Sequence, residues 1–244
     1  MHGVEFEGHG EAMKLSVVIP IYNEERTLAK LVERVLAVDY GFEELEIVLV
    51  DDHSRDRSQQ IGRQFSEKHD NILFIRLPRN RGKGAAVRAG FNYATGDVLV
   101  IQDADLEYDP AELPSLVRLI RDDIADVVYG SRFLSIGAHR VLYYWHYLAN
   151  KALTFLSNLL TNVNLTDINV CYKAFRREVL DSIHLQENGF GIDPELTAKV
   201  TGTRWRVYEV PISYYGRTYQ EGKKIGLKDA FRHLYVILKY NLIG

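Results

Sequence analysis

Short apolar runs alternate with polar loops and with segments of helical periodicity through the first half of the chain. We predict strands at LSVVIPIY from Leu15, EIVLVDD from Glu46, NILFIRL from Asn71, DVLVIQDAD from Asp97 and DVVYGSRF from Asp126. Helices are predicted between them, over residues 25–38, 57–68, 84–94 and 111–120. Continuous Val, Ile and Leu runs between amphipathic helices indicate a mostly parallel sheet covered on both faces. The pattern therefore predicts a Rossmann-like α/β fold.

Two stretches of the second half also carry apolar and aromatic residues at helical spacing. One covers residues 141–160, and the other, residues 226–243, is an amphipathic helix with Leu227, Phe231, Leu234, Ile237 and Leu238 toward one side. A transmembrane helix needs about 20 mostly apolar residues. Polar side chains interrupt the first stretch, so we expect no transmembrane segment.

The chain is expected to form one domain over residues 14–244. Residues 1–13 are polar, lack the basic and apolar regions of a signal peptide, and are predicted to be a flexible extension. With 244 residues and 46% hydrophobic content, the chain can bury a sizeable core.

The charge and cysteine content narrow the choice of function. A net charge of -3 lacks the basic excess that nucleic-acid binding calls for, so no nucleic-acid partner is expected. The single cysteine, Cys171, can form no intrachain disulfide, which fits a reducing compartment.

Polar residues follow four of the predicted strands, and ligands bind beyond the carboxyl ends of strands in such sheets. These tails are residues 20–24, 51–54, 103–107 and 130–132. Taken singly, two of them could simply begin helices, with Asn23 and Ser54 as N-caps. A functional interpretation depends on all four meeting at one edge of the sheet.

Asp103 and Asp105 are the sharpest pair in these tails. Side chains two apart on an extended segment face the same way, so both carboxylates can approach one cation, and Glu107 follows at the same spacing. Hard oxygen ligands suit Mg²⁺ or Mn²⁺. We predict a metal site at Asp103 and Asp105 with Glu107 as an adjunct, and assign Asp109, just before Pro110, to the start of the next helix.

Other nucleotide-binding motifs fit poorly. The chain has no G-x-x-x-x-G-K-[ST] loop. GKGAAVRAG resembles half of a dinucleotide fingerprint, but Val87 stands where the third glycine should be. We therefore assign Gly82 and Gly84 to a tight turn.

An ordered series of motifs resembles the inverting family-2 glycosyltransferases of GT-A fold, and within them the polyprenyl-phosphate and dolichyl-phosphate sugar synthases. The series is VVIPIYNEE, VLVDDHSRD, NRGKGAAVRAG, DADLEYDP, GSRF and EVPISYYGRTYQEGKKIG, and it extends from about Leu15 to the C-terminus. The resemblance implies a GT-A fold and transfer of a sugar from a nucleotide sugar.

The resemblance also implies roles for individual residues. Asp103, Ala104 and Asp105 match the family's D-A-D motif, and Glu107 stands where relatives often have glutamine. The residues implied to contact the nucleoside of the donor are Pro20, Tyr22, Glu24, Val50 and Asp52. Those implied to contact phosphates of donor or acceptor are Arg132, Arg217, Lys223 and, in the acceptor segment LTDINVCYKAFRR, Lys173.

Two departures from the family pattern stand in these motifs. His53 replaces the usual glycine of DDGS, and NVC replaces the commoner T-S-G of the acceptor segment. The second departure leaves the identity of the acceptor open.

The chemistry that follows is stabilisation of a leaving diphosphate. A metal on Asp103 and Asp105 would act as a Lewis acid, with Asp105, Arg217 and Lys223 as the catalytic set. A phosphate acceptor, with a second pKa of about 6, is largely ionised at neutral pH and needs cations more than a base. The C-terminal part, 138–244, suits that need and is expected to lie near acceptor and membrane.

The sequence therefore predicts metal-dependent inverting transfer of a sugar to a polyprenyl or dolichyl phosphate at the cytoplasmic face of the membrane. GDP-mannose is favoured as donor by the resemblance, and UDP-sugars stay open. A basic, aromatic helix can lie in a membrane interface, but the same stripes also suit packing on the sheet or in a homodimer, and a membrane-protein partner is equally open. The alternatives are a saccharide hydroxyl acceptor with Asp193 or Glu195 as base, and a non-catalytic nucleotide-sugar sensor.

Overall fold

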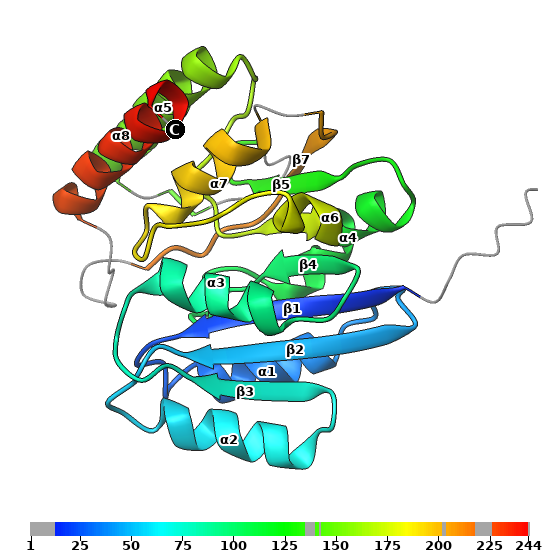
Figure 1. The fold of residues 1–244 in the computed structure, drawn as a ribbon. Coiled ribbons are helices and arrows are strands. Elements are labelled where there is room, and N and C mark those ends of the chain that lie inside the picture. Colours follow the sequence, from blue (N-terminus) through cyan, green and yellow to red (C-terminus); the bar gives the residue numbers. More distant parts are fainter. Residues whose placement is uncertain (1–12, 135–139, 142, 202–203, 218–225, 244) are drawn as a thin grey trace, which may run out of the picture.

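The computed structural model describes residues 13–134, 140–141, 143–201, 204–217 and 226–243. Within these ranges one seven-stranded sheet runs through the molecule in the order β3-β2-β1-β4-β6-β5-β7 (Figure 1). The strands are β1 (Lys14–Ile21), β2 (Glu44–Asp51), β3 (Ile72–Arg76), β4 (Val98–Ile101), β5 (Val127–Ser131), β6 (Lys173–Arg176) and β7 (Val207–Pro211). Only β6 is antiparallel to its neighbours, β4 and β5. The predicted mostly parallel α/β sheet is confirmed.

Helices cover both faces of this sheet. In Figure 1, α3 lies in front of β1 and α1 lies behind β2. The helices are α1 (Leu28–Leu36), α2 (Ser58–Lys68), α3 (Lys83–Tyr93), the short 3-10 turn η1 (Pro110–Glu112), α4 (Leu113–Arg121), α5 (Tyr144–Thr161), α6 (Arg177–Asp181), α7 (Ile192–Thr201) and α8 (Leu227–Leu242). All the predicted helices are present, with ends shifted by at most three residues.

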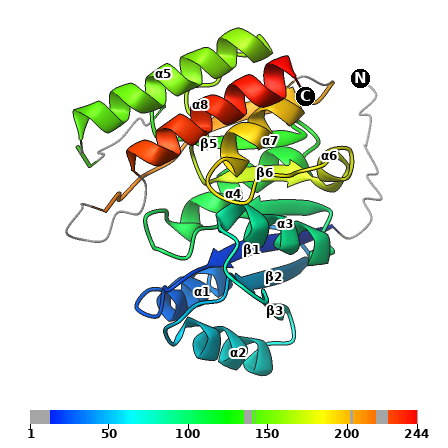
Figure 2. The same ribbon diagram turned by 60° about the vertical axis from the view of Figure 1, so that its left-hand side comes forward.

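Three helices form a further layer beyond β5 and β7. Figures 1 and 2 show α5 and α8 side by side, with α7 between them and the sheet. Among the helices of the described ranges, none is both long enough and apolar enough to cross a bilayer.

The register of the parallel strands brings their polar tails together. Ile21 at the end of β1 is paired with Asp51 at the end of β2, and Val18 is paired with Ile101 at the end of β4. The Val, Ile and Leu residues of these strands are buried, because both faces of the sheet are covered. The tails after β1, β2 and β4 therefore leave the core at the same edge.

Asn23 and Ser54 do not cap helices, so the alternative interpretation of their two tails is wrong. The N-cap of α1 is Thr27 and that of α2 is Arg57. Asn23 instead donates its backbone N–H to Ser54 Oγ at 3.0 Å, and its Oδ1 accepts the Arg55 N–H at 2.8 Å. The side chains of Asn23 and Ser54 therefore join the tail after β1 to the tail after β2 instead of capping helices. Asp109 does cap η1, accepting the Ala111 N–H at 3.1 Å.

Candidate functional site

A cavity of about 300 Å³ opens at this edge of the sheet, and all four predicted tails contribute to it. Ten of the residues predicted from the sequence line it: Pro20, Tyr22, Glu24, Asp52, Asp103, Ala104, Asp105, Glu107, Arg132 and Arg217. Residues separated by almost 200 positions in the chain thus share one surface, as the strand-end rule predicts.

Asp103 and Asp105 each face a cation across this cavity. Lys83, in the first turn of α3, places its Nζ 2.7 Å from Asp103 Oδ1. The Arg217 guanidinium lies 2.6 Å from Asp105 Oδ2. Both carboxylates are less than one-quarter exposed, so these ion pairs are much less screened than surface pairs.

Glu107 makes a different set of contacts from the two aspartates. It accepts hydrogen bonds from the backbone N–H and the Nε–H of Arg217, at 2.9 and 3.1 Å, and from the Tyr214 hydroxyl at 2.9 Å. These contacts hold the segment after β7 against the loop after β4. Glu107 therefore positions Arg217.

The donor set at Asp103 and Asp105 fits a divalent cation. Burial, together with the carboxylates of Asp103 and Glu107, raises the pKa of Asp105 to about 7 although Arg217 opposes the rise. A cation at this point would offset that excess of negative charge. Within the part of the chain that the structure describes, no three acidic, histidine or cysteine side chains converge on one point. The protein thus offers two carboxylates, as Mg²⁺ sites completed by substrate phosphates do.

Asp52 organises the loop that leads into α3. Its carboxylate accepts the backbone N–H groups of Arg81 and Gly82, both at 2.7 Å, and the Asn80 side-chain amide at 2.9 Å. Because Lys83 follows directly, this loop sets the position of the ammonium that meets Asp103.

The predicted tight turn at Gly82 and Gly84 is wrong, because Gly82 is the N-cap of α3 and Gly84 lies in the first turn of that helix. Packing explains both glycines. Gly82 has φ of +97°, a conformation that L side chains rarely adopt, and a Cβ there would lie 2.6 Å from the Asn188 carbonyl oxygen. At Gly84 a Cβ would lie 2.4 Å from the Glu187 carbonyl oxygen. The loop before α7 therefore packs directly on the start of α3.

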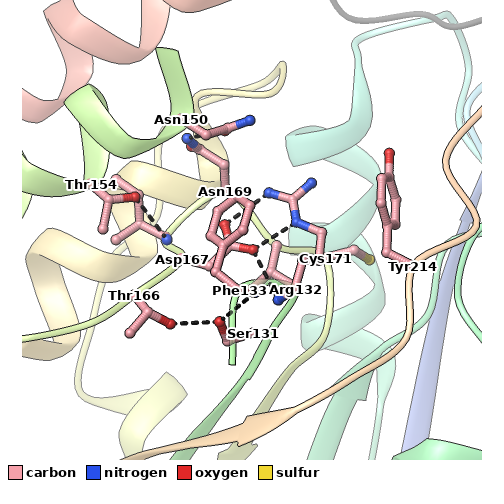
Figure 3. Close-up of polar contacts among 12 residues, drawn as sticks. Ser131, Arg132, Phe133, Asn150, Thr154, Thr166, Asp167, Asn169, Cys171 and Tyr214 are labelled. Atoms are coloured by element: carbon pink, nitrogen blue, oxygen red, sulfur yellow. Dashed lines mark hydrogen bonds and ion pairs between the residues drawn. The ribbon is translucent and has the colours of Figure 1, made fainter. Parts of the chain in front are cut away.

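Arg132 lies at the other side of the cavity and is held by Asp167. Its Nε and Nη2 donate to the two carboxylate oxygens at 2.6 and 2.8 Å (Figure 3). The guanidinium carbon also lies 5.1 Å from the centre of the Tyr214 ring. This bidentate pair fixes the orientation of Arg132. Asp167 belongs to the segment LTDINVCYKAFRR, which also supplies Asn169 and Cys171 to this part of the site.

Two predicted site residues, Val50 and Lys173, do not line this cavity. Val50 is fully buried within β2, where it packs in the core. Lys173 is also fully buried, and its ammonium is bound by the Val170 carbonyl and, at 2.5 Å, by Asp193. We correct both assignments, because neither side chain lines the cavity. Lys223 lies outside the described residues.

Several residues that line the cavity were not predicted from the sequence. Lys83, Asn80, Asn169, Cys171 and Tyr214 all line the cavity, as does Asp193, which the sequence offers only as a base in the alternative mechanism. Lys83 stands in the NRGKG motif, and that motif is the signal that could have identified it. His53 has φ of +61°, which explains why a glycine suits this position, and its Nδ1 lies 3.2 Å from the Leu77 carbonyl oxygen.

Solved structures share this fold over nearly the whole chain. Glucosyl-3-phosphoglycerate synthase from Mycobacterium tuberculosis, in complex with Mn²⁺, UDP and glucosyl-3-phosphoglycerate, is 18% identical with a TM-score of 0.70, over 95% of this chain and 81% of that one. Its complex with Mg²⁺ and UDP gives a TM-score of 0.69 at 18% identity, over 95% and 80%. The chain thus has a fold of the GT-A class.

The family within this class follows from the sequence comparison. The model of glycosyl transferase family 2 matches residues 16–183, and the chain belongs to this family. Dolichol-phosphate mannosyltransferase from Pyrococcus furiosus is 33% identical over 93% of this chain. Undecaprenyl-phosphate 4-deoxy-4-formamido-L-arabinose transferase from Photorhabdus laumondii is 38% identical over 70% of it. The chain covers 64% and 51% of the lengths of these two relatives.

Proposed function

We propose that this protein transfers a sugar from a nucleotide sugar to a polyprenyl phosphate, with inversion at the anomeric carbon and with the help of Mg²⁺ or Mn²⁺. The observation that carries the proposal is the charge pattern of the cavity. Asp103 and Asp105 lie beside the cations Lys83 and Arg217, and Arg132 lines the same cavity. Such a site can bind one metal ion and two phosphate groups, one of the donor and one of the acceptor.

On the donor side, the residues of the chain bind and orient the diphosphate. Asp103 and Asp105 would hold the metal ion, which supplies a Lewis acid for the negative charge that develops on the leaving phosphate. Lys83 and Arg217 lie beside these two carboxylates. Their N–H groups are therefore close enough to the metal site to donate hydrogen bonds to the leaving phosphate. Asp52 keeps the loop before Lys83 in place. Lys223 stays in this proposal as a further cation.

On the acceptor side, the site suits a nucleophile that is already ionised. Burial alone would raise the pKa of Asp193, but the charges of Lys173 and Lys83 lower it, so this carboxylate is a weak base. Glu195 is fully buried and accepts the backbone N–H groups of Gln186 and Glu187, both at 2.7 Å. Neither residue suits the activation of a saccharide hydroxyl, which favours a phosphate monoester over that alternative.

The donor is best sought among GDP- and UDP-sugars. The Pyrococcus relative bears the name of a mannosyltransferase, which favours GDP-mannose. The Mycobacterium structures contain UDP, which keeps UDP-sugars as the second class. A thermal-shift screen of both classes with Mn²⁺ should identify one stabilising nucleotide sugar, since a ligand that binds only the folded state raises the melting temperature.

A peripheral contact with the cytoplasmic face of the membrane is part of the proposal, and α5 supports it. The buried side chains of this helix are the polar Thr154 and Ser157, whereas Trp145, Phe155 and Leu159 are 67 to 75% exposed. The outer face of α5 thus carries large apolar side chains in addition to Leu153, Leu156 and Leu160, which pack against the core, whereas the outer face of an ordinary surface helix is polar. A lipid surface would cover such aromatic side chains.

The transfer assay tests the proposed reaction. The protein is incubated with GDP-mannose or UDP-sugars, polyprenyl phosphate and Mn²⁺. The lipid products are separated and identified by mass spectrometry. We expect a lipid-linked sugar phosphate, its loss on chelation of the metal, and at least a 100-fold lower rate for Asp105→Asn.

The matched control for this assay is Asp109→Asn, which changes a carboxylate of the same loop that caps η1 and does not line the cavity. Asparagine also caps helices, so this variant should keep the wild-type rate. Full activity of Asp105→Asn in the presence of a chelator would defeat the metal assignment. Tight donor binding without turnover on any acceptor would instead favour a nucleotide-sugar sensor.

A further inference from the structure

Asn169 lines the cavity next to the segment that holds Arg132, and both atoms of its side-chain amide are engaged by helices of the outer layer. Its Nδ2 donates to Asn150 Oδ1 of α5 at 2.9 Å (Figure 3). Its Oδ1 lies 2.8 Å from His233 Nδ1 of α8. One side chain of the cavity wall is therefore clamped between the two helices that carry the exposed aromatic face.

We call the hydrogen-bonded set Asn150, Asn169 and His233 the clamp. The direction of each of its hydrogen bonds follows from the one that Asn150 makes to the backbone of its own helix. Asn150 Nδ2 donates to the His146 carbonyl at 3.0 Å, and a carbonyl can only accept. Asn150 must then present its oxygen to Asn169, which in turn must present its own oxygen to His233. His233 therefore carries a proton on Nδ1. Burial lowers the pKa of His233, although Asp193 and Asp229 oppose this, which favours the neutral ring. In the described structure its Nε2 is buried without a hydrogen-bond partner.

The rest of the α5 inner face supports the same segment. Asn158 Nδ2 donates to the Leu165 carbonyl at 2.7 Å, and the Ile168 N–H donates to Thr154 Oγ1 at 3.5 Å. Residues 150, 154 and 158 are four apart and thus lie on one helix face. That face holds residues 165–169, and Asp167 within them holds Arg132.

We propose that Asn150 and His233 are positioning residues that set Asn169 and, through its segment, the Arg132 end of the cavity. The inference concerns the same site and rests on the proposed transfer to a lipid phosphate. Neither residue lines the cavity, so their loss should leave the donor in place and misplace the acceptor end. A displacement near 1 Å can cost about 100-fold in rate.

Three variants of His233 and Asn150 test this role. His233→Leu removes the donor to Asn169, whereas His233→Asn keeps an N–H group at the place of Nδ1. Asn150→Ala removes the acceptor from the other side, at a half-buried position. We expect roughly 10- to 100-fold lower kcat/KM for the lipid phosphate in His233→Leu and Asn150→Ala, a donor Kd within about 2-fold of wild type, and recovery in His233→Asn.

Tyr40→Phe is the matched control, because it also removes a buried hydrogen bond, from the Tyr40 hydroxyl to the Val35 carbonyl at 3.0 Å. It should lower stability without the acceptor effect. Overlap of the kinetics of His233→Leu and Asn150→Ala with those of Tyr40→Phe would overturn the proposal, as would an equal loss of donor affinity and acceptor turnover.

A tautomer measurement tests the clamp without any enzyme assay. In a long-range ¹H–¹⁵N spectrum of protein labelled on histidine, with the His233 signals assigned by their absence in His233→Asn, we expect a protonated Nδ1 and a bare Nε2. The opposite tautomer would overturn the clamp. A wild-type protein with the expected tautomer but without transfer to lipid phosphate would defeat the proposed function and leave the clamp intact.

Discussion

Gly82 controls how closely the two sides of the cavity approach each other. Its backbone lies against Asn188 in the loop before α7, and its φ of +97° is one that other residues rarely adopt. Arg88 secures the same loop, donating to the Glu187 carbonyl at 2.5 Å and to Asn188 Oδ1 at 2.7 Å. Since Lys83 is the next residue, any displacement of Gly82 moves the cation at Asp103.

Gly82→Ala should therefore reduce both stability and donor affinity. The added Cβ would lie 2.6 Å from the Asn188 carbonyl oxygen at a strained φ, which costs about 1–3 kcal/mol. Chemical denaturation and a donor titration measure the two effects. Gly189→Ala is the matched control, because a Cβ there meets nothing within 4 Å. Equal behaviour of the two variants would contradict the packing account.

At the scale of single elements, α5 carries large apolar side chains that the described part of the chain leaves exposed. Trp145 and Phe155 are 75% and 70% exposed. Phe231 on the neighbouring α8 is 71% exposed. The two helices lie side by side (Figure 2), and each carries exposed aromatic side chains of the kind that a lipid surface covers.

Replacing Trp145 and Phe155 together by serine should weaken binding to anionic lipid vesicles by about 10-fold or more, because burial of each large apolar side chain contributes about 1.5–3 kcal/mol. Vesicle sedimentation measures the partition. Tyr93→Ser, at a 58% exposed position on α3, serves as control and should bind like wild type. Unchanged partition of the double variant would contradict a role of α5 at the membrane.

The strands β5 and β7 are tied at their amino ends by a charged cluster around Asp126. Its carboxylate accepts hydrogen bonds from the Arg206 backbone N–H at 2.9 Å and from Nη2 at 2.8 Å. These hydrogen bonds from Arg206 lower the pKa of Asp126 to about 2. A carboxyl with a lowered pKa stabilises the fold above its unfolded pKa of about 3.9 and loses that contribution as the pH falls toward 2.

Asp126→Asn should therefore be less stable than wild type at pH 7, by about 1 kcal/mol for charge-assisted hydrogen bonds that are partly screened by solvent. The difference should shrink between pH 4 and pH 2. Urea denaturation at several pH values measures it, and a difference that stays constant down to pH 2 would contradict the assignment.

For the whole molecule, the periodicity of the chain was enough to predict five of the seven strands, six of the helices and the edge that carries the site, whereas β6, β7, α6 and α7 were not predicted. Asp103, Asp105 and Arg217 could be named because strand ends and motifs place them. Lys173 was misassigned because a motif shows no burial: β6 carries this lysine into the sheet, where Asp193 neutralises it. The clamp on Asn169 could not be predicted, since it joins Asn150 and His233 across 83 positions only through the packing of α5 on α8.

The transfer to a phosphate is the central claim, and one product analysis tests it most directly. The protein is given a nucleotide sugar, Mn²⁺ and two competing acceptors, a polyprenyl phosphate and a saccharide, and the product is examined by ³¹P and ¹H NMR. We predict a lipid phosphodiester whose anomeric configuration is inverted relative to the donor. A sugar attached to the saccharide hydroxyl, or a lipid product with retained configuration, would contradict the account.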